Sequence, residues 1–129
     1  MSTPSYITIR DSTIEGAGSG AFAAEELVKG RYLGDYTGKE LDPNSSEAEG
    51  DYVLFIQGYD SKGKEVLRCI DAVSETSDWP RFINSIREGD GLKANCKFFI
   101  NRDKVSVQAL RVIAIGEELL VDYGHDYVF

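Results

Sequence analysis

The side chain best suited to chemistry in this sequence is a tyrosine close to the C-terminus. Tyr123 follows the apolar run 119–121, which is typical of a short buried strand, and it lies in an Asp-Tyr-Gly turn. A phenol where a buried strand meets open space can hydrogen-bond a substrate or direct a lone pair at a reacting nitrogen. On this segment alone an ordinary core tyrosine is the simpler interpretation, so the prediction of a site depends on other parts of the chain.

A loop with three alternating glycines is the second candidate. Gly16, Gly18 and Gly20 lie between two short predicted strands. A dinucleotide site would need a helix after the glycines, and a phosphate-binding loop would need a Gly-Lys-Ser/Thr sequence; neither pattern is present. The glycines would still let a ligand approach the backbone and bond its N–H and C=O groups. A tight hairpin explains the same pattern without any ligand.

The composition indicates one acidic, globular domain. The 129 residues are 42% hydrophobic, and 14 basic against 22 acidic side chains give a net charge of −8. Such a charge repels nucleic acid and attracts basic partners, although acidity that serves solubility alone is common. Cys69, Cys96 and the single histidine show no metal-ligand spacing, so we predict no metal site. The two cysteines could form one disulfide. Without a signal peptide or a membrane-spanning run, we expect an intracellular protein with reduced thiols and no membrane partner.

Short strands separated by frequent turns must position these residues. Gly34 within one strand predicts a bulge or a close backbone contact. One short helical stretch is predicted within residues 77–86, with Asp78 as its N-cap and Pro80 in its first turn. The chain is therefore predicted to be a mostly β domain. Apolar or alternating runs predict strands at 6–10, 21–23, 31–36, 52–56, 66–71, 96–100, 105–109 and 119–121, with turns at 60–63 and 101–103 and a polar loop at 42–50.

Five sets of residues, taken together in their order along the chain, resemble the motifs of the SET-domain lysine methyltransferases. The resemblance extends from about Thr8 to Tyr127, and we expect residues 1–129 to form a single SET domain. The matching segments are 16–23 (GAGSGAFA), 34–38 (GDYTG), 69–72 (CIDA), 81–85 with 95–96 (RFINS and NC), and 116–119 with 122–124 (GEEL and DYG).

Some features differ from the usual pattern of this family. Ser85 stands where the family usually has a histidine, and residues 86–94 lengthen the loop before Asn95. Together with Trp79, these features resemble the PR-type branch, some members of which are poor enzymes. The cysteine-rich zinc segment that usually follows the last motif is absent from this sequence, as it is from small single-domain members, including virus-encoded ones.

The resemblance implies a fold and a reaction. The SET-domain fold is a set of several short curved sheets with a knot-like crossing near the C-terminus, which would bring Tyr123 beside Asn84. The reaction is methyl transfer from S-adenosylmethionine to a lysine ε-amine, with the two substrates entering a narrow channel from opposite faces. Since a sulfonium is already a good leaving group, this chemistry needs no metal and no covalent nucleophile.

The resemblance also implies roles for individual residues, each of which could instead be a packed core residue. Tyr123 would be catalytic, by directing the amine, and would contact the cofactor as well. The other cofactor-binding residues would be Ala17, Gly18, Ser19, Asn84 and Ser85. The substrate channel would be lined by Tyr36, Phe98 and Val121. Because neither Phe98 nor Val121 is a tyrosine, transfer of more than one methyl group is favoured.

The expected partner is a basic protein substrate, a histone tail, which an acidic surface would attract. This substrate would place the protein in the nucleus or on chromatin, without direct contact to nucleic acid. The oligomeric state stays open, a homodimer included. Ser85 keeps a second function open, a SET-like binding or regulatory module with weak or no turnover. An unrelated nucleotide-binding β domain is a more distant alternative.

Overall fold

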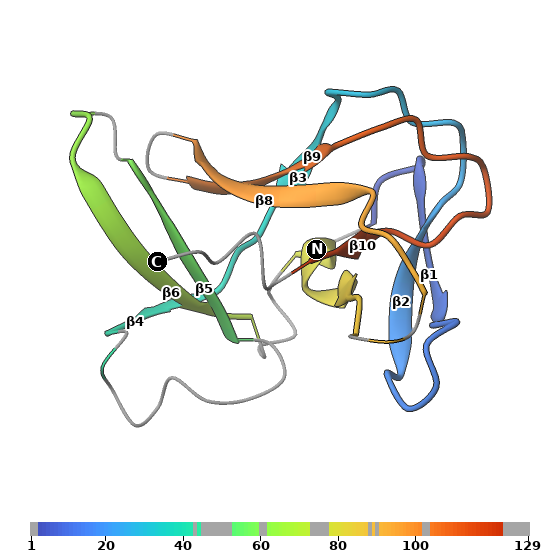
Figure 1. The fold of residues 1–129 in the computed structure, drawn as a ribbon, viewed down its shortest axis with the longest axis horizontal. Helices are drawn as coiled ribbons and strands as arrows, with labels where there is room; N and C mark the ends of the chain where they lie inside the picture. Colours follow the sequence, from blue (N-terminus) through green and yellow to red (C-terminus); the bar gives the residue numbers. More distant parts are fainter. Residues whose placement is uncertain are drawn as a thin grey trace.

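The computed structural model describes residues 3–42, 44, 53–59, 62–72, 78–87, 89, 91–101 and 104–122, and almost all regular structure in them is β (Figure 1). The prediction of a mostly β domain is therefore confirmed. In chain order the elements are β1 (Ile7–Asp11), β2 (Ser19–Ala23), β3 (Tyr32–Asp35), β4 (Lys39–Leu41), β5 (Val53–Tyr59), β6 (Glu65–Asp71), the 3-10 turn η1 (Trp79–Phe82), β7 (Asn84–Ser85), β8 (Cys96–Asn101), β9 (Lys104–Ala109) and β10 (Leu120–Val121).

The described strands form several small sheets and no single large one. β1 and β2 are antiparallel, β3-β9-β8 and β4-β6-β5 are three-stranded antiparallel sheets, and β10 pairs with β7 in parallel. In Figure 1 the β4-β6-β5 sheet is on the left and β1-β2 on the right, with η1 and β10 between them. The short elements at the centre are thus surrounded by longer strands.

The central strands show why these residues form sheets. β9 is the middle strand of its sheet, and its residues 105–107 (VSV) are all buried. A strand covered on both faces needs such a run, in contrast to the alternation of a half-exposed strand. Val107, Leu33, Leu54 and Ile113 are each 0% exposed and belong to one hydrophobic core. One continuous core therefore joins the small sheets.

Two local predictions from the sequence are confirmed. The register between β3 and β9 shifts between Tyr32 and Gly34, which is the bulge expected at this glycine. A Cβ atom at Gly34 would approach the Trp79 indole to 3.1 Å, so the glycine also makes room for that ring. Asp78 is the N-cap of η1, with its carboxylate accepting from the Trp79 N–H at 3.0 Å, and a proline lies in the first turn.

The short helical stretch predicted within residues 77–86 is a single turn. Among the described residues of this range, Trp79–Phe82 are helical, and Ile83 is already extended. The next two residues form β7, because Asn84 and Ser85 pair with Leu120 and Val121 of β10. A distant strand therefore decides the conformation of residues that could locally continue a helix.

Some predicted features lie outside the described residues. They are Tyr52 at the start of one predicted strand, most of the 42–50 loop, parts of the 60–63 and 101–103 turns, and Tyr123 with the glycine that follows it.

Candidate functional site

A cavity of about 330 Å³ lies between the glycine loop and the segment that follows η1. One wall comes from the glycine loop, where Gly16 and Gly18 have φ angles of +78° and +74° that side-chain-bearing residues rarely adopt. The other wall is the end of η1, β7 and the two residues after it. The lining residues are Gly16, Ala17, Ser19, Arg81, Phe82, Ile83, Asn84, Ser85, Ile86 and Arg87. Of the five residues predicted to bind cofactor besides Tyr123, four line this cavity, and Gly18 lies in the same loop.

Asn84 connects the two walls of the cavity. Its side-chain nitrogen donates to the Ser19 carbonyl at 3.0 Å and to Glu118 Oε2 at 3.2 Å. The side chain is thus held from both sides, while the residue also pairs with Leu120 through its backbone. Ser85 is next to it, and its hydroxyl donates to the Ile86 carbonyl at 3.1 Å.

Glu118 is a buried anion behind this cavity that the sequence analysis did not identify as a site residue. It is only 6% exposed, and its carboxylate accepts from Ser12 Oγ, Thr13 N, Thr13 Oγ1 and the Asn84 amide. Burial alone raises the pKa of Glu118, but the hydrogen bonds from Thr13, Ser12 and Asn84 outweigh it and lower the pKa below its ordinary value. In the sequence, the feature that could have indicated this residue was the pair of acids directly before an apolar strand.

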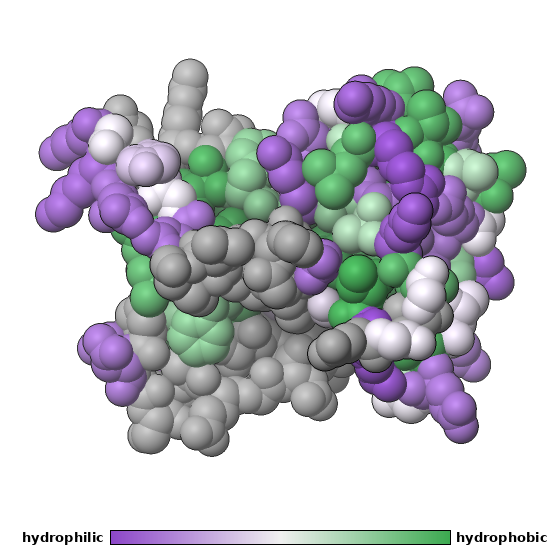
Figure 2. Space-filling view, viewed as in Figure 1, coloured by the Kyte–Doolittle hydropathy of each residue, from purple (hydrophilic) through white to green (hydrophobic). Residues whose placement is uncertain are grey.

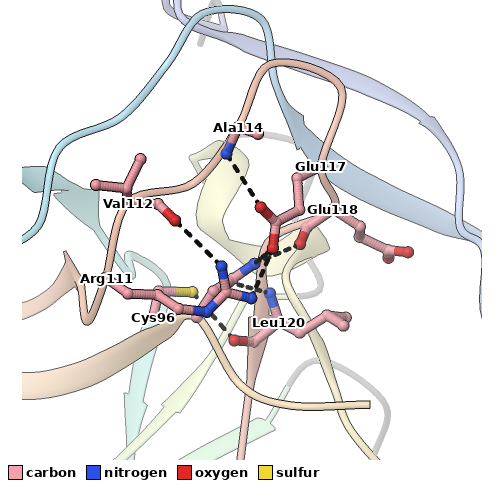
Figure 3. A network of polar contacts seen from close by, with 8 residues as sticks. Cys96, Arg111, Val112, Ala114, Glu117, Glu118 and Leu120 are labelled. Atoms are coloured by element: carbon pink, nitrogen blue, oxygen red, sulfur yellow. Dashed lines mark hydrogen bonds and ion pairs between the residues drawn. The ribbon is translucent and has the colours of Figure 1, made fainter. Parts of the chain in front are cut away.

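The adjacent Glu117 serves a different network, which is drawn in Figure 3. Its carboxylate accepts from Arg111 at 2.7 Å, from the Ala114 N–H at 3.0 Å and from the Asn95 amide at 3.2 Å. Burial raises the pKa of Glu117, and the bonds from Arg111, Ala114 and Asn95 lower it by more. This carboxylate therefore fixes the turn before β10 and takes no part in lining the cavity.

Asn95 holds β10 from the side opposite to β7. This side chain is 1% exposed; its nitrogen donates to the Glu118 carbonyl at 2.7 Å, and its oxygen accepts from the Leu120 N–H at 2.8 Å. The Leu120 carbonyl accepts in turn from the Asn95 N–H at 2.9 Å and from the Cys96 thiol at 3.4 Å. Cys69 and Cys96 are both buried, and neither forms a disulfide.

β10 consequently runs between the two ends of one loop. Leu120 bonds Asn95, while the Val121 carbonyl accepts from the Ile86 N–H at 2.8 Å. Successive residues of a strand direct their backbone groups to opposite sides, so both edges of β10 are paired. This is the arrangement expected of the knot-like crossing, as far as Asp122, the last described residue.

A second cavity, of about 270 Å³, is lined in part by Tyr36, one of the three residues predicted to line the substrate channel. The other two, Phe98 and Val121, are not among its lining residues. Tyr36 is 3% exposed, and its ring meets Phe98 edge to face, with centroids 5.3 Å apart and planes at 76°. Val121 is 0% exposed and lies in the same hydrophobic core as both rings. The lining residues of this cavity are Asp35, Tyr36, Thr37, Gly38, Glu40, Arg68, Ile70, Lys104 and Val105.

The turn η1 links the two cavities, which share no lining residue. At its start, the Asp78 N–H donates to Thr37 Oγ1 of the second cavity at 2.8 Å. At its end, Arg81 and Phe82 line the first cavity, and Arg81 also donates to the Ala72 carbonyl at 3.1 Å. A single helical turn therefore fixes both sites relative to each other.

The described residues thus bring together most, but not all, of the predicted site. Tyr123, the residue predicted to be catalytic, lies outside them. Among the described residues there is no group of three or more histidine, cysteine, aspartate or glutamate side chains placed to hold a metal. No helix in the described part of the chain is long and apolar enough to span a membrane.

Comparison with known proteins gives consistent matches. The family model of the SET domain matches residues 18–124. The zebrafish (Danio rerio) N-lysine methyltransferase KMT5A-A is 34% identical over 121 residues, which cover 86% of this chain and 33% of that protein. The Caenorhabditis elegans histone-lysine N-methyltransferase set-17 is 28% identical over 124 residues, covering 96% of this chain and 43% of that protein. The chain thus spans less than half the length of these relatives.

Among solved structures, the methyltransferase domain of human PR domain-containing protein 2 has a TM-score of 0.72 and 26% identity. The match covers 92% of this chain and 76% of that domain. It agrees with the PR-type features predicted around Trp79 and Asn84.

Proposed function

Because this chain belongs to the SET-domain family, we propose that it is a protein-lysine methyltransferase that moves a methyl group from S-adenosylmethionine to a lysine ε-amine. The observation that carries the proposal is the cavity between Ala17 and Asn84, since it joins two of the segments that resemble family motifs. Curated relatives with lysine methyltransferase names support the same reaction.

The first cavity fits the chemistry of this cofactor. Its volume of about 330 Å³ lies in the ~300–1,000 Å³ range of small-molecule sites. Its walls include residues of a glycine loop, two serines, Ser19 and Ser85, and two arginines, Arg81 and Arg87. Arginine is suited to a carboxylate such as that of the methionine part. When bound, the cofactor supplies a methyl group on a sulfonium.

Ala17, Gly18, Ser19, Asn84 and Ser85 are the residues we propose to hold the cofactor. The loop residues would bond it through their backbone, which approaches closely because Gly16 and Gly18 carry no side chain. Asn84 would keep the loop wall in position through its bond to the Ser19 carbonyl.

The second cavity is proposed to receive the lysine. Attack requires a neutral amine, although a free lysine has a pKa near ~10.4. Burial against the Tyr36 ring would disfavour the ammonium form and lower that pKa. Tyr123 would accept a hydrogen bond from the amine and direct its lone pair. Positioning of this kind can contribute ~7–11 kcal/mol.

The proposed substrate class is a basic protein segment, and a histone tail meets that description. The chain carries a net charge of −8, which attracts lysine-rich and arginine-rich segments over long distances. A histone substrate would also place the protein in the nucleus. The relative set-17 bears the name of a histone-lysine methyltransferase, which supports this choice.

The decisive experiment incubates the purified chain with labelled S-adenosylmethionine and mixed histones, followed by mass spectrometry of the modified lysine. The Asn84→Ala variant should no longer label the histones, because it lacks the side chain whose hydrogen bond to the Ser19 carbonyl joins the two walls of the cavity. The matched control is Asn44→Ala, at an exposed residue that lines neither cavity, which should label normally.

The alternative is a binding module with little turnover, which Ser85 in place of the usual histidine favours. Calorimetry in the presence of a chelator separates the two functions. Cofactor binding without labelling of any protein would support the module, and absence of cofactor binding would contradict the methyltransferase.

A further inference from the structure

The carboxylate of Glu118 is connected to the cofactor cavity without lining it. Oε1 accepts from the Thr13 N–H at 2.9 Å and from Thr13 Oγ1 at 2.6 Å, while Oε2 accepts from Ser12 Oγ at 2.7 Å and from the Asn84 amide at 3.2 Å. Each oxygen therefore has two donors. A buried carboxylate with this many partners keeps its charge.

Two of these contacts, those from Asn84 and Ser12, lead to the walls of the cavity. The Asn84 nitrogen that donates to Glu118 also donates to the Ser19 carbonyl in the glycine loop. Ser12 connects Glu118 to a second residue of the same loop. Its hydroxyl donates to Glu118, and its backbone N–H donates to the Gly18 carbonyl at 2.8 Å. Glu118 thus joins the loop and the Asn84 segment from behind.

The surrounding backbone leaves this carboxylate little freedom. A Cβ atom at Gly20 would overlap Glu118 Oε2, so the glycine provides the space that the carboxylate occupies. The backbone of Glu118 is fixed by an antiparallel bridge to Phe22 of β2. The carboxylate is therefore a preorganised group and not a mobile surface acid.

From this arrangement we propose that Glu118 is a positioning residue for the cofactor site, acting through Asn84 on the glycine loop; the inference depends on the proposed use of the first cavity for the cofactor. Glu118 sets the affinity for S-adenosylmethionine without touching it. The rate of methyl transfer at saturating cofactor depends on it much less, because the reacting atoms lie elsewhere.

Glu118→Gln is the appropriate change because it keeps the shape of the side chain. The backbone N–H of Thr13 must still face an oxygen, so the new NH₂ group faces Ser12 and Asn84. The Ser12 hydroxyl can rotate to accept, but the Asn84 NH₂ cannot. In the variant, two NH₂ groups, one from the new amide in place of the carboxylate and one from Asn84, would therefore face each other without an acceptor. Asn84 would shift, and its hydrogen bond to the Ser19 carbonyl would weaken.

The experiment measures the dissociation constant for S-adenosylmethionine by calorimetry, kcat at saturating cofactor and the thermal midpoint without cofactor. Glu118→Gln should weaken cofactor binding about tenfold or more, the effect of losing a hydrogen bond to a charged group. The matched control Glu117→Gln, whose carboxylate serves Arg111 and Asn95, should bind cofactor like the wild type even though its thermal midpoint falls.

A double-mutant cycle tests the route through Asn84. In an Asn84→Ala background, Glu118→Gln should cause little further loss of affinity, because the connection is already broken. An equal loss in both backgrounds would contradict the route, and normal affinity of Glu118→Gln would overturn the inference.

Two further results keep the inference distinct from the proposed function. A wild type that binds no cofactor would overturn both, whereas wild-type binding with an unaffected Glu118→Gln overturns only the inference. If Glu118→Gln does not fold, Glu118→Asp replaces it, since this change keeps the charge but shortens the side chain and withdraws the carboxylate from the Asn84 amide. Weaker cofactor binding by Glu118→Asp would support the inference, and unchanged binding would overturn it.

Discussion

Two neighbouring glutamates show how far the role of a side chain depends on its direction. Glu117 points to Arg111 and Asn95 at the crossing, whereas Glu118 points to Thr13 and Asn84 at the cavity. Consecutive residues of an extended segment face opposite sides, so two identical side chains reach two different networks. Both carboxylates have lowered pKa values, and both therefore stabilise the folded chain in their charged form.

These lowered pKa values predict a loss of stability in acid. The contribution of each group is complete above the ordinary glutamate pKa of 4.5 and is lost as the pH falls through the lower folded value. The difference in free energy of unfolding between the wild type and Glu118→Gln should therefore be large near pH ~7 and smaller near pH ~3. Urea unfolding at both pH values measures it, and a difference independent of pH would contradict the assignment.

Tyr123→Phe is expected to remove turnover and leave cofactor affinity nearly unchanged. The substitution removes one oxygen and keeps the ring, so packing is preserved. A positioned hydrogen-bonding group of this kind is worth ~3–4 kcal/mol in the transition state, by analogy with an oxyanion-hole donor. Steady-state rates together with calorimetry test this. A Phe variant with the wild-type rate would show that another residue directs the amine.

Among the strands and turns, the shortest elements have the largest effect on the site. β10 contains only Leu120 and Val121, yet it is paired on one edge by β7 and on the other by Asn95. η1 contains four residues and joins the two cavities. Neither element would be stable in isolation. Their conformations depend on the segments that surround them.

Asn95→Ala should therefore destabilise the whole fold. The change leaves the Leu120 N–H and the Glu118 carbonyl, both buried, without the partner they have now. We expect a loss of ~2–4 kcal/mol in the free energy of unfolding, since each buried unsatisfied group costs ~1–3 kcal/mol. Denaturant unfolding provides the measurement. Asn44→Ala, at an exposed residue, serves as the control and should change stability by less than ~0.5 kcal/mol.

Over the whole chain, charge and shape support the same proposed substrate. The chain has a net charge of −8, and the face in Figure 2 carries hydrophilic side chains on both flanks. Two separate cavities would let the cofactor and the protein substrate bind independently. Acidity of this kind increases the rate at which a basic segment is encountered but does not select one lysine.

Binding of a basic peptide should accordingly weaken as salt is added. Attraction between exposed charges is screened over ~8–10 Å at ordinary ionic strength. Fluorescence anisotropy of a labelled lysine-rich peptide at increasing salt concentration tests this, with a peptide of neutral sequence as the control. An affinity that stays constant from low to high salt would mean that the acidity serves only solubility.

Local patterns were sufficient wherever a segment determines its own conformation. The bulge at Gly34, the Asp78 cap and the strands β6, β8 and β9 follow from glycine geometry, side-chain capping and apolar runs. The short helical stretch within residues 77–86 was also predicted, but its end at Phe82 was not, because residues 84–85 can form either helix or strand and a distant partner selects the strand. Glu118 was missed because a buried acid and an exposed acid look alike in a sequence.

The sequence by itself determined the class of fold, the family and the segments that meet at the site, because these depend on local periodicity and on motif order. The tertiary structure alone decided which side chains meet. The bond between Asn84 and Glu118 joins residues 34 positions apart, and Thr13 and Glu118 are 105 apart. Such contacts exist only when a collapsed core overcomes the entropy of closing long loops, and no local pattern encodes that balance.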